Sequence, residues 1–182
     1  MMGAASSRLV IALFLAVVAS APAAAQSKQS QQRQAEVAVR GAEVMPFDLA
    51  TSSHVFTKSR NGGLQQVLVK NPGDANQLRL VRSHLRDIAA RFERGDFSAP
   101  AHIHGDDMPG LAQLKQAKPG EIAIHYRELS NGAQIRYATS NPALVPVLHQ
   151  WFDAQLADHG ADAHEGHQHD HQHQHHGGHA PH

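Results

Sequence analysis

In the middle of this chain, a strand-like pattern of hydrophobic residues is followed by a helical one, and this order occurs twice. Residues 47–58 and 64–70 read as two strands, joined by the turn Arg60-Asn61-Gly62-Gly63. Residues 121–128 and 133–139 repeat the pattern, with apolar residues alternating with polar ones around a Ser-Asn-Gly turn. Alternation with a period of two is typical of strands with one buried face. The sequence therefore predicts two β-hairpins.

A helical pattern follows each hairpin. The first helix is capped by Asp74 and ends before Gly95, and the second opens at Asn141-Pro142 and runs to Gly160. Each has an apolar stripe at helical spacing: Leu78, Val81, Leu85, Ile88 and Phe92 in the first, and Val145, Leu148, Phe152 and Leu156 in the second. The order ββαββα predicts a single α+β domain over residues 44–160. We expect a mostly antiparallel four-stranded sheet with two helices on one face.

The first residues have the pattern of a secretory signal peptide. A short basic start at residues 1–8 precedes an apolar run over 9–19, and Ala23-Ala24-Ala25 forms a small-residue cleavage site. We therefore expect a periplasmic or secreted protein that is not inserted in the membrane after cleavage. Residues 26–43 are rich in Gln and Ser, which predicts a polar linker or a frayed helix outside the core.

Residues 161–182 carry the strongest signal of function. Ten of the sixteen histidines fall between His159 and His182, interleaved with Gln, Asp and Gly. Such a tract has no apolar surface to bury, so we predict a disordered tail, and neutral imidazoles in this number favour binding of copper, zinc or nickel. A solubilising tail and a purification tag are the alternatives. The predicted ligands in the tail are His164, His167, His169, His171, His173, His175, His176, His179 and His182.

A second candidate site lies in the irregular stretch between the two hairpins. If residues 101–108 are extended, His102 and His104 project to one side, and Met108 can return across the turn at Gly105. Imidazole and thioether together favour copper, whereas a zinc site needs only histidines and a carboxylate. The alternative is a surface loop with solvated histidines and a methionine in the core. His54 and His84 are the next candidates, because their elements are expected to pack together.

Composition argues against several other functions. The chain has no cysteine, which excludes disulfides and thiolate metal sites. Its 16 basic and 16 acidic residues balance, and the basic ones are scattered, so we expect no nucleic-acid partner. Phosphate-binding glycine motifs, zincin motifs and nucleophile elbows do not occur.

Several short motifs between Val44 and Gly160 resemble a group of small bacterial proteins. They are Met45-Pro46-Phe47, His54-Val55-Phe56, Arg91-Phe92, Gly95-Asp96-Phe97, the run from Ile103 to Gly110, Trp151-Phe152-Asp153-Ala154-Gln155 and Asp158-His159-Gly160. Some members of the group carry the name aspartate carbamoyltransferase. That activity implies a Ser-Thr-Arg-Thr loop for carbamoyl phosphate. The nearest segment here, 56–61, lacks that run and leads into a hairpin.

The sequence thus leads to one main hypothesis and two alternatives. The main one is an exported protein that buffers, sequesters or delivers copper, zinc or nickel, with copper favoured. Its partners would be the metal ion and possibly another metal-handling protein. The first alternative is a binding module for a small molecule or a protein partner, in which the histidine tail is incidental. The second is an enzyme, which includes the named transferase.

Overall fold

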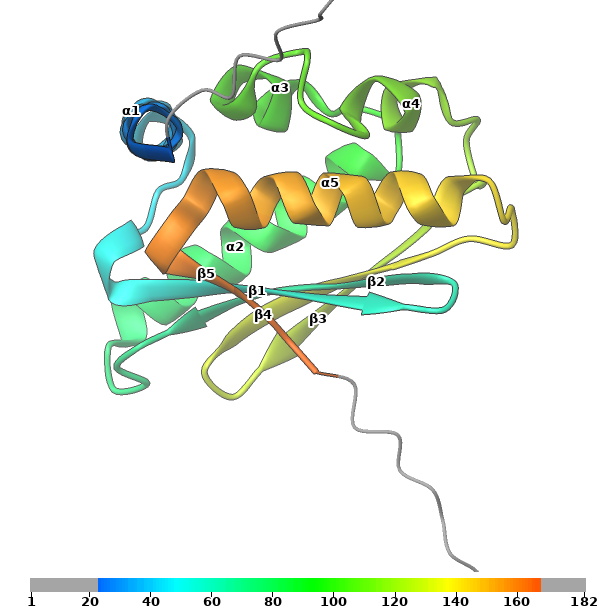
Figure 1. The fold of residues 1–182 in the computed structure, drawn as a ribbon. Helices are drawn as coiled ribbons and strands as arrows, with labels where there is room; N and C mark the ends of the chain where they lie inside the picture. Colours follow the sequence, from blue (N-terminus) through cyan, green and yellow to red (C-terminus); the bar gives the residue numbers. More distant parts are fainter. Residues whose placement is uncertain (1–22, 168–182) are drawn as a thin grey trace, which may run out of the picture.

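The structure is a computed structural model that describes residues 23–167. One five-stranded sheet is covered on one face by helices (Figure 1). The elements are α1 (Ala23–Val44), the short 3-10 helix η1 (Leu49–Thr51), β1 (Ser52–Ser59), β2 (Gly62–Val69), α2 (Ala75–Phe92), α3 (Ser98–His104), α4 (Leu111–Gln116), β3 (Ala123–Leu129), β4 (Gly132–Ala138), α5 (Leu144–His159), η2 (Gly160–Asp162) and β5 (Ala163–Glu165). The predicted α+β class is confirmed, as are both hairpins and the two long helices that follow them.

The sheet has the order β3-β4-β2-β1-β5. Four strands pair antiparallel, with β2 and β4 joining the two hairpins side by side. The prediction of a four-stranded sheet is wrong, because β5 pairs parallel with β1 and places Ala163 opposite His54. The folded part of the chain therefore runs past the predicted boundary at Gly160. It includes the first residues of the segment that we expected to be a disordered tail.

The helices form two layers above the sheet. α2 packs on β2, β3 and β4, and α5 packs on β1, β2 and β5. α1, α3 and α4 lie farther from the sheet, beyond α5 (Figure 1). None of the helices within residues 23–167 is long and apolar enough to cross a lipid bilayer. α3 replaces the first part of the extended segment that we expected over residues 101–108.

Helix α1 corrects the prediction of a linker over residues 26–43. The helix packs against α3 and α5, and its Val37 is only 1% exposed. Polar side chains of the helix also contact α3 and α5 through hydrogen bonds. Arg40 donates from Nε to the carbonyl oxygen of Ile103 at 2.7 Å, and Gln34 donates to that of Ala157 at 2.9 Å. The predicted mature N-terminus, Gln26, lies in the first turn of this helix.

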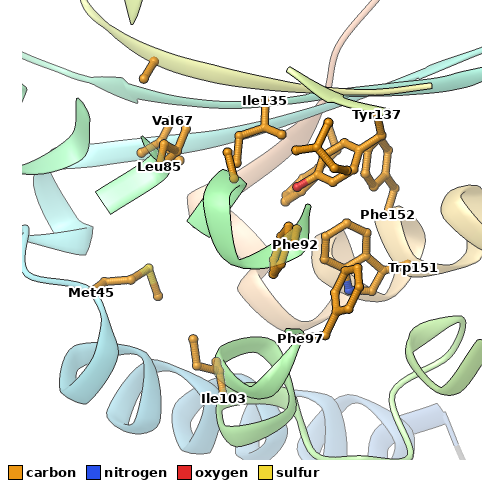
Figure 2. Packing of buried hydrophobic residues seen from close by; sticks show 14 of the residues in the cluster. Met45, Val67, Leu85, Phe92, Phe97, Ile103, Ile135, Tyr137, Trp151 and Phe152 are labelled. Atoms are coloured by element: carbon orange, nitrogen blue, oxygen red, sulfur yellow. The ribbon is translucent and has the colours of Figure 1, made fainter. Parts of the chain in front are cut away.

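The core is dominated by aromatic rings between the sheet and the helices (Figure 2). Trp151 of α5 contacts Tyr137 of β4 edge-on, with ring centroids 5.4 Å apart, and lies 5.9 Å from Phe92 of α2. Phe97 stacks on Phe92 at 4.5 Å. These contacts fix α5 and the start of α3 relative to the sheet. The same elements carry the histidines of the candidate site.

A test of this packing is the close approach of α5 to β2 at Gly63. A Cβ atom there would lie 2.4 Å from the ring of Phe152 and 2.5 Å from the carbonyl oxygen of Thr57. We expect Gly63→Ala to lower the free energy of unfolding by about 2 kcal/mol, measured by urea denaturation. The matched control is Gly73→Ala in an exposed turn, where the nearest atom is 3.2 Å away, and it should cost less than about 0.5 kcal/mol. Equal losses in the two variants would contradict this packing.

Candidate metal centre

Four histidines from four elements line a small cavity between the sheet and the helices. They are His54 of β1, His84 of α2, His104 of α3 and His159 at the end of α5. The cavity has a volume of about 50 Å³, and its remaining wall is largely apolar. Such a volume accommodates a few water molecules, a metal ion or a very small molecule. His54 and His84 thus line one cavity, although β1 and α2 are not closely packed against each other.

His159 lies between two of the other rings. Its ring stacks on His54 with centroids 4.6 Å apart and planes 9° apart. The ring of His104 meets it edge-on at 5.2 Å. His84 lies against Phe47 at 5.5 Å, on another side of the cavity. Three imidazoles are thus in direct ring contact, and the fourth is nearby.

His104 is held by an ion pair that is itself shielded from water. Its Nδ1 is 2.8 Å from Oδ2 of Asp158, and the His104 side chain is 2% exposed. Arg33 of α1 donates to both oxygens of Asp158, at 2.9 and 2.8 Å, and to the carbonyl oxygen of His104 at 2.6 Å. Burial alone would raise the pKa of Asp158, but hydrogen bonds from His104 and Arg33 hold that pKa well below its usual range. The ionised carboxylate accepts the Nδ1 proton, so a neutral His104 has its lone pair on Nε2.

The other rings of the cavity are uncharged at neutral pH. Burial, followed by the proximity of His159, His84 and His104, lowers the pKa of His54 well below its usual value. Burial lowers the pKa of His84 to about 4 and that of His159 to about 4. Each ring therefore has a free lone pair on one nitrogen at pH 7. This is the protonation state that metal binding requires.

Among the residues that the structure describes, two buried nitrogen atoms of side chains lining the cavity have no hydrogen-bond partner. They are Nδ1 of His54 and Nε1 of Trp151. His54 also makes a hydrogen bond to the backbone of Asp162, just before β5. An unpaired buried polar atom lowers the free energy of unfolding by about 1–3 kcal/mol. These atoms therefore mark the cavity as a place where a ligand or water belongs.

The structure separates His102, His104 and Met108, which the sequence grouped as one candidate site. Residues 98–104 are helical, and positions two apart in a helix point about 200° away from each other. His102 is exposed and pairs with Glu43 at 3.0 Å, whereas His104 points inward. Met108 is 2% exposed within the hydrophobic core and does not line the cavity. The prediction of an extended segment is wrong, and among these three residues only His104 lines the cavity.

Sequence analysis missed two residues of the site, His159 and Met45. His159 was noted in the motif Asp158-His159-Gly160 and counted with the histidine-rich tail but was not predicted as a ligand, although it follows Phe152 by seven residues and so continues the buried stripe of α5. Met45 lies just after α1 and lines the same cavity. In the sequence, Met45 was noted only as part of the motif Met45-Pro46-Phe47. Its position in the cavity was not predicted, because the end of a buried α1 was not expected there.

The other predicted ligands belong to the C-terminal segment. His164 lies on β5 and His167 follows it, and both are exposed. The remaining ones, His169, His171, His173, His175, His176, His179 and His182, lie outside the residues that the structure describes. β5 starts four residues after His159 and runs along β1 from His54 to Phe56.

Within residues 23–167, no three His, Asp or Glu side chains are arranged as a ready-made metal site. The rings around the cavity would have to rotate to direct three nitrogens at one point. Comparison of the chain with protein-family models, curated proteins and solved structures gives no match. The chemistry of the cavity is therefore the basis for assigning a function.

Proposed function

We propose that this protein binds transition-metal ions, with copper favoured over zinc and nickel, and that it buffers, sequesters or delivers them. The observation that carries the proposal is the buried set of neutral imidazoles around His54, whose Nδ1 has no partner within residues 23–167. An exported location, predicted from residues 1–25, belongs to the same proposal. A second metal-handling protein would be the partner for delivery.

The bond between His104 and Asp158 supports this function. Histidines that bind metals commonly donate their other ring N–H to a carboxylate, which fixes the tautomer and makes the free nitrogen a better ligand. Asp158 does this for His104, and Arg33 fixes Asp158. The rings of His54 and His159 are stacked rather than joined by a hydrogen bond. Small rotations of these two rings would complete the set of metal ligands.

The C-terminal histidines extend the proposal. A stretch of sequence with many imidazoles captures ions with modest selectivity, whereas a buried cavity selects by size and ligand type. We assign the capture of ions to the segment from His164 onward and their tighter binding to the cavity. The two sites would differ in stoichiometry, since the cavity accommodates a single ion.

Metal content tests this division directly. Full-length protein is loaded with copper, desalted and analysed by mass spectrometry. One variant has Asn in place of the seven histidines from His169 to His182, and we expect it to keep about one copper ion per chain. Adding His54→Leu and His159→Leu should remove that ion. Adding His125→Gln instead, at an exposed position on β3, should leave it in place.

Two outcomes would count against the proposal in different ways. If the tail variant holds no copper, the cavity is not a metal site. If the full chain also holds none, metal binding as a whole is wrong.

A second function is favoured by one observation that a metal ion does not explain. Nε1 of Trp151 is a buried donor without an acceptor, and an indole N–H does not bind metals. Gln155, which is 5% exposed, also lines the cavity with its amide. A small oxygen-containing molecule could accept hydrogen bonds from these groups. Binding of such a molecule, abolished by Trp151→Phe without loss of copper, would support this alternative.

A further inference from the structure

The cavity wall contains a methionine in addition to the histidines. Met45 follows α1, is 7% exposed and lines the cavity together with His54, His104 and His159. Figure 2 shows its side chain extending inward from the segment after α1, toward the interior space between α2 and α3. Thioether sulfur is a soft, neutral ligand that selects Cu(I) over harder divalent ions. The combination of imidazole and thioether that we had expected at Met108 thus occurs at Met45.

The charges around the cavity favour an ion of low charge. Asp158 is the carboxylate nearest to His104, and Arg33 already compensates it. Among the described residues that line the cavity, none is an Asp or a Glu. A buried ion would therefore bring its charge into a site without net negative charge. Because the Born cost of burial rises with the square of the charge, a divalent ion costs roughly four times as much as a monovalent one.

We propose that the cavity is a Cu(I) site. Met45 supplies the sulfur ligand, and His54 and His104 supply imidazole nitrogens. His159 is the third imidazole ring, adjacent to these two. This inference rests on the proposed function and specifies the oxidation state and the ligand set. Neutral imidazole and thioether ligands satisfy Cu(I) without an anionic ligand. The apolar walls formed by Val67, Leu85 and Ile103 keep the ion away from water.

The test uses the full-length chain in which the seven histidines from His169 to His182 are replaced. Cu(I), supplied without oxygen, is titrated against the chromogenic chelator bicinchoninate. We expect one Cu(I) per chain and at least a tenfold loss of affinity in Met45→Leu. Met108→Leu is the matched control, because both methionines are buried and the same exchange nearly conserves volume. It should leave the affinity unchanged.

Copper K-edge absorption gives a second measurement, which checks the sulfur ligand in protein that is not mutated at Met45. A sulfur neighbour of copper is expected in that spectrum and in the Met108→Leu variant. Nitrogen neighbours alone would overturn the role of Met45. Tighter binding of Zn(II) than of Cu(I) would overturn the preference for the monovalent ion.

The outcomes also separate this inference from the proposed function. If His54→Leu abolishes copper binding but Met45→Leu does not weaken it, the cavity binds metal and the sulfur assignment is wrong. If the tail-substituted chain binds neither Cu(I) nor Zn(II), both this inference and the domain site of the proposed function fail.

Discussion

Between pH 7 and pH 5, the free energy of unfolding of the metal-free protein is expected to fall by about 4 kcal/mol. The cause is the set of buried neutral histidines. His54, His84 and His159 all have a pKa below the ordinary value in the folded chain. In the unfolded chain each regains its ordinary pKa of about 6.5. Below that value the unfolded state therefore binds more protons than the folded state, and acid favours unfolding.

The pH window follows from the pKa values. The stability that these histidines contribute is fully present above about pH 6.5 and is lost as the pH falls toward the folded value of about 4 for His84 and His159. Asp158 acts at still lower pH. Its lowered pKa adds stability above about pH 4 that disappears under more acidic conditions. Urea denaturation in the presence of a chelator, at half-unit steps from pH 7.5 to 4.5, measures the slope.

Two variants make this prediction specific. His84→Gln removes one of the three titrating rings and should reduce the pH dependence by about a third. His125→Gln, at an exposed position on β3, should leave the pH dependence unchanged. A free energy of unfolding that is the same at pH 7 and pH 5 would show that the rings are not buried in neutral form.

Replacing Asp158 with Ala is expected to lower the free energy of unfolding by about 3 kcal/mol at pH 7. The substitution leaves Nδ1 of His104 without its acceptor and removes the only ion pair of Arg33 among the described residues. The Asp158 side chain is 10% exposed and that of His104 is 2% exposed, whereas Arg33 is 35% exposed. The substitution also removes one contact between α1 and α5. A lower affinity for copper should therefore accompany the loss of stability.

Asp153 provides the matched control on the same helix. It pairs with Lys58, but its side chain is 59% exposed, and exposed ion pairs contribute little. Asp153→Ala should therefore cost less than about 1 kcal/mol in the same urea experiment. A loss comparable to that of Asp158→Ala would contradict the view that shielding gives the Asp158 network its importance.

The parts of the fold that follow from hydrophobic periodicity were predictable, and those that depend on polar contacts were not. β1 and β2 have apolar centres, β3 and β4 alternate apolar and polar residues, and α2 and α5 have apolar stripes. α1 lacks such a stripe. Its attachment depends on Val37 and on arginine and glutamine bonds to carbonyl oxygens and to Asp158, contacts that leave no periodic signal. β5 is three residues long and pairs with a distant strand, so the pattern could not reveal it.

The candidate site was predictable only in part, for a related reason. His54, His84 and His104 were identified as candidates, and they line one cavity. Their partners were wrong, because the conformation of residues 98–104 decides which side of the chain faces inward. A helix there turns His102 outward and leaves Met45, from a different element, as the nearby sulfur. Ligand sets assembled from distant elements depend on tertiary packing, which spacing along the sequence does not determine.

The most direct test of the central claim is an anomalous difference map, measured at the copper edge, from crystals of the full-length protein loaded with Cu(I). A peak inside the cavity, adjacent to His54 and His104, is the predicted result. A cavity that contains only water while copper binds elsewhere on the chain would contradict the claim that these buried imidazoles form a metal site.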